Sequence, residues 1–81
     1  MARGSDKSDE KVHLGKLGDV IRQRRQGLNM SQEALADAAH IGRTHMGEVE
    51  RGKRNISFLA LVRIAAAVKV APSEIIRAAG L

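Results

Sequence analysis

Apolar residues recur along this chain at helical spacing, and no segment alternates apolar and polar residues in the way that predicts a strand. Leu14, Leu17, Ile21 and Leu28 are three, four and seven positions apart, so they share one face of a predicted first helix. Gly27 stands where a left-handed residue would end that helix. The predicted helices span about residues 13–26, 32–39, 43–51, 58–69 and 72–79. The pattern therefore predicts an all-α domain.

Residues that favour helix ends separate these segments. Ser31 and Ser57 precede the second and fourth predicted helices, where a serine hydroxyl can accept a hydrogen bond from a free N–H of the first turn. Pro72 suits the first position of the fifth helix, because its missing N–H is not needed there. Gly52 and Gly80 follow the third and fifth helices. These signals agree with the boundaries that the apolar pattern predicts.

The second and third predicted helices are short, and only residues 40–42 separate them. Two helices joined by so tight a turn have the geometry of a helix-turn-helix, in which the second helix enters the DNA major groove. Ala36 is small where the two helices would cross, and Ile41 can anchor the turn in the core. Met46 and Val49, three positions apart, would face inward from the second helix of the motif.

Composition limits the kind of partner. The 81 residues include one aromatic side chain, Phe58, and no cysteine, and the formal net charge is +5. Positive charge suggests an anionic partner, and proteins that bind single strands usually stack bases on aromatic side chains. Because the chain lacks such a platform, double-stranded DNA is the expected partner.

The net charge lies outside the N-terminal segment. Residues 1–11 contain three basic and three acidic residues, so the whole surplus belongs to residues 12–81. We expect residues 1–11 to form a flexible arm and residues 12–81 to form one DNA-binding domain, with the helix-turn-helix at 31–52 and dimerisation helices at 57–79. The sequence shows no apolar run long enough to span a membrane and no secretory signal, which predicts a cytoplasmic protein with no membrane partner.

The stretch from residue 32 to residue 52 resembles the Cro/XRE-like, phage-repressor type of helix-turn-helix regulators. The resemblance is carried by LNMSQEALA at 28–36 and EVERG at 48–52. Further residues fall where that family keeps its fourth and fifth helices. These are Ser57, Leu61, Ile64, Ala65, Val68 and Ile75. The resemblance covers about residues 14–79 and implies a five-helix, repressor-like fold and a transcriptional regulator.

Within that family, residues 42–57 most resemble the controller proteins of restriction–modification systems. A phage or mobile-element repressor, an antitoxin and a protein-interaction module that does not bind DNA remain alternatives. His40 stands where the family usually has glycine; histidine tolerates the left-handed region, so we expect some strain without loss of the fold. The DNA sequence that other members recognise cannot be carried over to this chain.

Four residues on the outer face of the third predicted helix are expected to contact bases. They are Arg43, Thr44, Gly47 and Glu48. Arginine can pair with guanine O6 and N7, and threonine offers a hydroxyl and a methyl group. Gly47 would allow a close approach to DNA, or is simply tolerated in the helix. A carboxylate at Glu48 could accept from cytosine N4, but pairing with Arg43 or Arg51 is the favoured interpretation.

A second set of residues is expected to contact phosphates. It comprises Gln32, His45, Lys53, Arg54, Asn55 and Ser57. The role of Gln32, including bracing of the recognition helix, is implied by the family resemblance, and Ser57 is expected to act first as a helix cap. Glu50 should pair with Arg22 or Arg25 and so connect the first and third helices. Whether an arginine among residues 22–25 binds phosphate or is only solvated stays open.

The chain offers little for catalysis or metal binding. His40 and His45 are five positions apart, which does not place them on one helix face, and no cysteine completes a ligand set. The sequence contains no nucleophile motif, phosphate-binding glycine loop or paired-carboxylate pocket. We therefore expect no enzyme activity, catalytic residue, metal, cofactor or small-molecule ligand.

The fourth predicted helix has more apolar residues than one face can use. Its inward stripe is predicted to be Phe58, Leu61, Ile64, Ala65 and Val68. A helix that is apolar on two faces must be covered on both. We therefore expect a homodimer across a second set of residues. This set is Leu59, Val62, Ala66, Ile76 and Leu81. If the regulator activates transcription, Glu33 and Asp37 are the candidates for contact with RNA polymerase.

Overall fold

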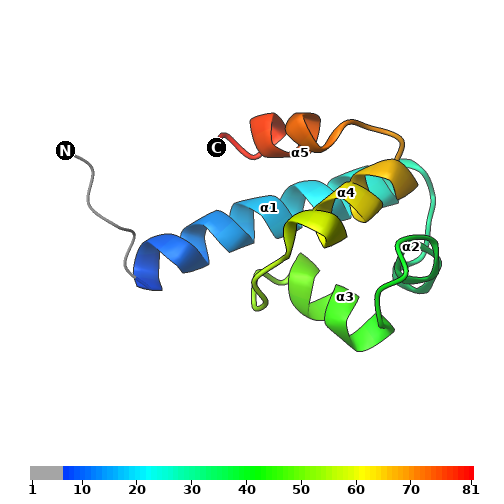
Figure 1. Ribbon diagram of the computed structural model, residues 1–81, viewed down its shortest axis with the longest axis horizontal. Helices are drawn as coiled ribbons and strands as arrows, with labels where there is room; N and C mark the ends of the chain where they lie inside the picture. The colour runs from blue at the N-terminus through cyan, green and yellow to red at the C-terminus, as the bar shows by residue number, and fades with distance from the viewer. Residues whose placement is uncertain (1–6) are drawn as a thin grey trace.

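The structure is a computed structural model that describes residues 7–81, and this part of the chain forms five helices (Figure 1). They are α1 (Lys7–Gly27), α2 (Gln32–Ala38), α3 (Arg43–Glu50), α4 (Phe58–Ala67) and α5 (Pro72–Ala78). The predicted all-α class is confirmed, and α2 to α5 end within two residues of their predicted boundaries. Within residues 7–81, none of the helices combines the length and the apolar character of a membrane-spanning segment.

Helix α1 starts earlier than predicted, at Lys7 instead of about residue 13. The expectation of a flexible arm over residues 1–11 is therefore wrong for residues 7–11, and residues 1–6 lie outside the described part. The sequence offers a physical reason, because Asp9 and Glu10 in the first turn favour a helix N-terminus and residues 7–13 contain no proline or glycine.

The turn after α1 also differs from the prediction. Gly27 is the last residue of α1, and the left-handed residue is Asn29, with φ 57°. Asparagine is one of the few side chains that adopt this region readily. The turn at Asn29 directs Leu28 away from the core, where it is 41% exposed, and Met30 packs against the core instead. The placement of Leu28 on the buried face of the first helix was therefore wrong.

The predicted caps are confirmed. The Ser31 hydroxyl accepts from the backbone N–H of Ala34 at 2.9 Å, and the Ser57 hydroxyl accepts from that of Ala60 at 3.0 Å. Pro72 lies in the first turn of α5. Each of these residues begins a helix through interactions within the first turn, without contacts to the hydrophobic core.

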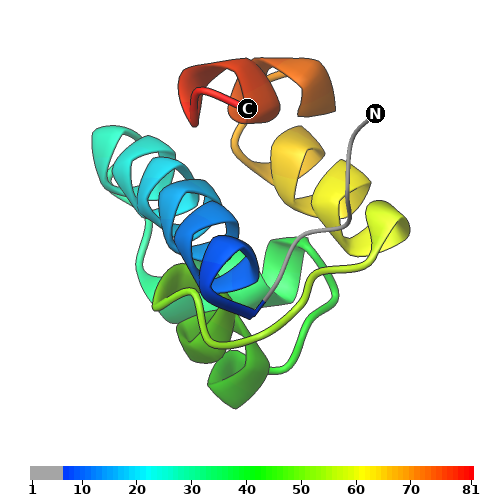
Figure 2. The ribbon, with the colours of Figure 1, turned by 90° about the vertical axis from the view of Figure 1, so that its left-hand side faces the viewer.

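One large apolar side chain from each helix is fully buried. These are Ile21, Leu35, Met46, Ile64 and Ile75, in chain order from α1 to α5. The long helix α1 packs against both α3 and α5, while α2 packs against α3 and α4. Helices α3 and α5 lie on opposite sides of α1 (Figures 1 and 2).

The prediction for α4 needs one correction. Leu61, Ile64, Ala65 and Val68 are buried as expected, but Phe58 is 73% exposed. Phe58 is the first residue of α4, and this end of the helix extends past α2 (Figure 1). A helical periodicity indicates which face a residue occupies, but it does not show whether a neighbouring helix reaches far enough to cover it.

Candidate nucleic-acid interface

The helix-turn-helix between α2 and α3 forms as the sequence predicts. Ala36 and Ile41 are buried, and the backbone N–H of Ile41 donates to the Ala36 oxygen at 2.9 Å, which closes the turn. His40 occupies the left-handed region with φ 56°, as expected for the position where the family usually has glycine. Arg63 of α4 adds a contact that sequence analysis missed, since its Nε donates to the Ala39 oxygen at 2.8 Å.

Glu50, at the end of α3, is the buried centre of a polar network. Only 3% of this residue is exposed, and its two carboxylate oxygens accept from Arg25 Nε at 2.7 Å and Arg25 Nη2 at 3.0 Å. Gln32 Nε2 donates to the same carboxylate at 3.1 Å, and Arg25 Nη1 donates to the Met30 oxygen at 3.0 Å. The hydrogen bond with Glu50 raises the pKa of Arg25, against the opposing effect of burial. The network therefore connects α1, α2 and α3.

These contacts decide one alternative left open by the sequence, which is the partner of Glu50. Glu50 pairs with Arg25, whereas Arg22 forms an exposed pair with Asp19 at 2.8 Å. The expected bracing role of Gln32 is present, because its amide nitrogen is bonded to the carboxylate at the end of α3. Each arginine among residues 22–25 has a carboxylate partner, and the third pair joins Arg24 to Glu74 of α5 at 3.3 Å. These pairs favour a structural role for the three arginines.

Two glycines allow α1 to approach the end of α3 closely. A Cβ atom at Gly18 would lie 2.5 Å from the Val49 oxygen and 2.6 Å from the Glu50 oxygen. Gly52 has φ 71°, and a Cβ there would lie 2.7 Å from the Cα of Gly15. Sequence analysis did not identify Gly18, because no local signal distinguishes a packing glycine from a tolerated one. The contacts fix α3 and the following loop against α1.

The outer face of α3 holds three of the four predicted base-contacting residues, whereas Gly47 is buried. Arg43 and Thr44 are exposed at its N-terminal end. Together with Gln32, Gly47 and Arg51, they line a surface pocket of about 340 Å³. A Cβ at Gly47 would lie 3.2 Å from Arg51 Nη1 and 3.3 Å from Gln32 Oε1, so these side chains occupy the space beside the glycine.

Arg51 is a member of this surface that sequence analysis considered only as a partner for Glu48. The spacing alone could have placed Arg51 on this surface. Arg51 follows Gly47 by four residues and Arg43 by eight, so all three share one helix face. The surface around the pocket therefore contains two guanidinium groups, from Arg43 and Arg51.

Glu48 forms an ion pair, but its partner is not the one predicted. Its Oε1 accepts from Arg54 Nη2 at 2.6 Å and from Arg54 Nε at 3.0 Å. The pair lowers the pKa of Glu48, chiefly through the hydrogen bond with Arg54. The expected intrahelical pairing with Arg43 or Arg51 is wrong, because the loop after α3 folds back and brings Arg54 to the carboxylate.

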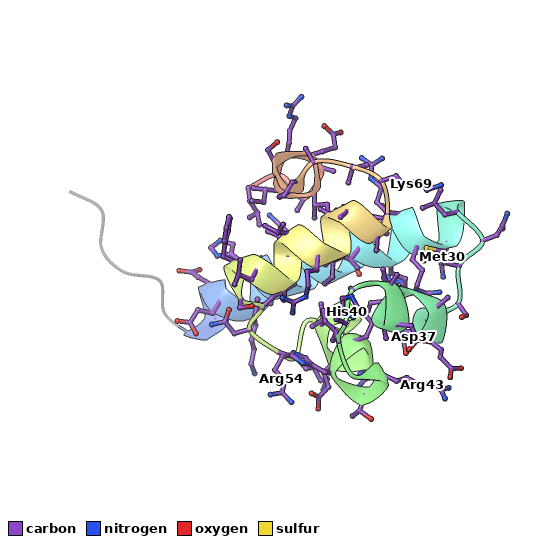
Figure 3. All side chains as sticks on the ribbon, turned by 45° about the vertical axis from the view of Figure 1, so that its right-hand side comes forward. Met30, Asp37, His40, Arg43, Arg54 and Lys69 are labelled. Atoms are coloured by element: carbon purple, nitrogen blue, oxygen red, sulfur yellow. The ribbon has the colours of Figure 1, made fainter. Side chains whose placement is uncertain are left out.

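The other predicted phosphate-contacting residues lie around α3. Lys53 and Asn55 are exposed in the loop between α3 and α4, and His45 is half-buried on α3. Ser57 is exposed and caps α4, as expected of its first role. Arg43 and Arg54 lie on the same side of the molecule, before and after the body of α3 (Figure 3). Polar and basic groups thus surround the outer face of this helix.

Known proteins are similar to this chain in sequence and fold. The helix-turn-helix family matches residues 21–75. Control protein C.BamHI of Bacillus amyloliquefaciens is 38% identical over 61 residues, covering 74% of this chain and 75% of that protein. Control protein C.SmaI of Serratia marcescens is 34% identical over 65 residues, covering 80% and 77%. The crystal structure of the restriction–modification controller protein C.AhdI from Aeromonas hydrophila has a TM-score of 0.75 and 37% identity, covering 76% of this chain and 94% of that one.

A braced recognition helix with basic groups on its outer face defines a DNA-binding protein of the helix-turn-helix class. The chain belongs to the helix-turn-helix family. It is a transcriptional regulator of the Cro/XRE type, and the resemblance to this family and to its controller proteins is confirmed.

Proposed function

We propose that this protein is a homodimer that binds a pseudo-palindromic operator and controls a restriction–modification operon. The observation that supports DNA recognition most directly is the outer face of α3, where Arg43 and Thr44 are exposed beside Arg51. The proposed action is binding alone, without a cofactor or small-molecule ligand. The restriction–modification controller protein C.AhdI and control proteins C.BamHI and C.SmaI are the similar proteins that motivate the choice of operon.

In the proposed complex α3 enters the major groove and its N-terminal residues contact base edges. Arg43 pairs with guanine, and Thr44 contacts a neighbouring base or its methyl group. Gly47 leaves room on this surface for the side chains of Arg51 and Gln32. Lys53 and Asn55 bind the flanking phosphates, as do Gln32 and His45 from their positions next to α3. Such phosphate contacts set position and salt dependence without selecting a sequence.

The proposed dimer joins α4 and α5 of two copies. Leu59 is 64% exposed, Ile76, Ala66 and Leu81 are exposed, and Val62 is half-buried. The exposed ring of Phe58 adds to the same end of α4. A two-fold axis through this surface would present two copies of α3 to half-sites about 34–36 Å apart.

Replacing Leu59 by aspartate should give a folded monomer that binds the operator much more weakly. The side chain is exposed within one subunit, so the charge should disrupt the proposed dimer without disturbing the core. Sedimentation equilibrium measures the mass. Leu28→Asp is the matched control, because Leu28 is also an exposed leucine but lies outside α4 and α5. A dimeric Leu59→Asp variant would contradict the proposed seam.

Replacing Arg43 by alanine should weaken operator binding by about 1–3 kcal/mol and relax the preference at one base pair of each half-site. Lys53→Ala should weaken operator and random DNA equally and reduce the slope of affinity against salt concentration by about one. Fluorescence anisotropy with labelled duplexes measures both effects. The assignment of Arg43 to bases fails if the two variants lose the same affinity on both duplexes.

The operator is expected in the DNA upstream of the chain's own gene, and footprinting of that region with the purified protein tests this. A neighbouring methyltransferase or endonuclease gene would support the proposed operon. If the protein activates transcription, the exposed residues Glu33 and Asp37 of α2 are the proposed contacts for RNA polymerase. If the protein binds DNA from another region and no site upstream of its own gene, control of its own operon is contradicted.

A further inference from the structure

The Glu48–Arg54 pair joins a residue of the DNA-facing side of α3 to the loop that flanks the groove. Arg54 uses two neighbouring donors, Nε and Nη2, on a single carboxylate oxygen. Both side chains remain accessible, at 52% for Arg54 and 31% for Glu48. The pair therefore lies where a DNA backbone could reach it.

We propose that this pair makes non-specific DNA binding unfavourable and so contributes to operator specificity. In the free protein Glu48 occupies the Nε–Nη2 edge of Arg54, one of the two edges through which a guanidinium can bind a phosphate. On DNA, Arg54 moves to a phosphate, and the released carboxylate requires a base amino group in the major groove. This inference rests on the proposed mode of DNA binding and deepens it, because it assigns Glu48 and Arg54 one coupled role.

The competition follows from the chemistry of the two groups. A guanidinium binds carboxylates and phosphates through the same pairs of parallel N–H donors. The Nε–Nη2 edge of Arg54 is already used by Glu48, so a phosphate must displace the carboxylate to take that edge. Binding of any duplex through this edge therefore exchanges one anion for another, and it gains less free energy than binding by an unpaired arginine would.

The free energy lost when the Glu48–Arg54 pair breaks on DNA then depends on the base sequence. An ionised carboxylate only accepts hydrogen bonds, and it is repelled by the surrounding phosphates. The major groove offers donors only at the amino groups of cytosine and adenine. A base pair that places such a group opposite Glu48 compensates the broken ion pair. A base pair that presents only acceptors there leaves the carboxylate without a partner, and such DNA is bound weakly.

The test compares Glu48→Gln with the wild type on operator DNA and on random DNA of equal length. Glutamine keeps the size of the side chain but releases Arg54. We expect affinity for random DNA to rise, the salt slope on random DNA to steepen by about one, and the ratio of operator to random affinity to fall about tenfold. Circular dichroism verifies that the variant is folded.

Two further variants separate the effect of the Glu48–Arg54 pair from the effect of net charge. Asp37→Asn removes the same single negative charge from an exposed residue of α2, so it measures the effect of net charge alone. Arg54→Ala in the Glu48→Gln background should abolish the gain on random DNA, because the released guanidinium is then absent. A scan of base pairs through the half-site should show one position whose amino group matters to the wild type and not to Glu48→Gln.

The outcomes are distinct. In the first outcome, the wild type discriminates between operator and random DNA, but Glu48→Gln changes the affinity for random DNA and the salt slope no more than Asp37→Asn does. The coupled role of Glu48 and Arg54 is then wrong, and the proposed function stands. The coupled role is also wrong if Glu48→Gln still raises the affinity for random DNA when Arg54→Ala is added. If the wild type binds all duplexes equally, the proposed function fails and this inference fails with it.

Discussion

Replacing Glu50 by glutamine should lower the free energy of unfolding by about 3–5 kcal/mol, the cost of removing one partner from a buried ion pair. Glu50 is almost fully buried and satisfies two donors of Arg25 and one of Gln32. Without its charge, the Arg25 guanidinium would stay in a poorly hydrated position with no opposite charge. The stability of a domain of this size is itself about 4–12 kcal/mol, so much of the population should unfold on mild heating.

Far-UV circular dichroism during urea denaturation measures this effect, and it suits a chain that has no tryptophan or tyrosine. Protein concentration must be held constant, because dimerisation would add to apparent stability. Asp19→Asn is the control, since it breaks the exposed Arg22–Asp19 pair and should cost less than about 1 kcal/mol. Equal losses for the two variants would show that the Glu50 network contributes no more than a surface pair.

Replacing Gly18 by alanine should destabilise the fold by about 1–3 kcal/mol, although alanine is the better helix former. The new Cβ would overlap the backbone oxygens of Val49 and Glu50, which cannot rotate away as a side chain could. Helix α1 must therefore move away from α3. Because the same displacement strains the Glu50 network, operator affinity should also fall.

Gly15→Ala is the matched control, three residues earlier on the same helix. A Cβ at Gly15 meets no atom within 4 Å, so this substitution should gain up to about 1 kcal/mol from helix propensity. Thermal denaturation of both variants measures the difference. If Gly18→Ala is as stable as Gly15→Ala, the close packing of α1 on α3 does not limit stability.

Much of the fold could be predicted because its signals are local. Ser31, Ser57 and Pro72 begin helices through interactions within one turn, and the structure shows them there. The short break before α3 and the apolar pair Met46 and Val49 were enough to predict the helix-turn-helix. These features depend on residues a few positions apart, which the sequence lists next to one another.

The candidate site was predicted less completely. The outer face of α3 follows from its periodicity, but the partner of Glu48 was wrong because Arg54 returns to it across a loop. The pairing of Glu50 with Arg25 was one of two alternatives, and its selection depends on how α1 lies against α3. Long charged side chains can reach several neighbours, so sequence spacing alone does not choose among them.

By itself, the sequence determined that residues 13–79 form five helices, that the second and third make a DNA-binding motif, and that this motif is of the Cro/XRE type. The tertiary structure decided that Gly18 is a point of close contact, that Phe58 is exposed and that Glu50 is buried and paired with Arg25. The physical reason is the range of the interactions. Helix propensity and capping act within a turn, whereas burial and ion pairing depend on which helices meet, and that depends on the packing of the whole domain.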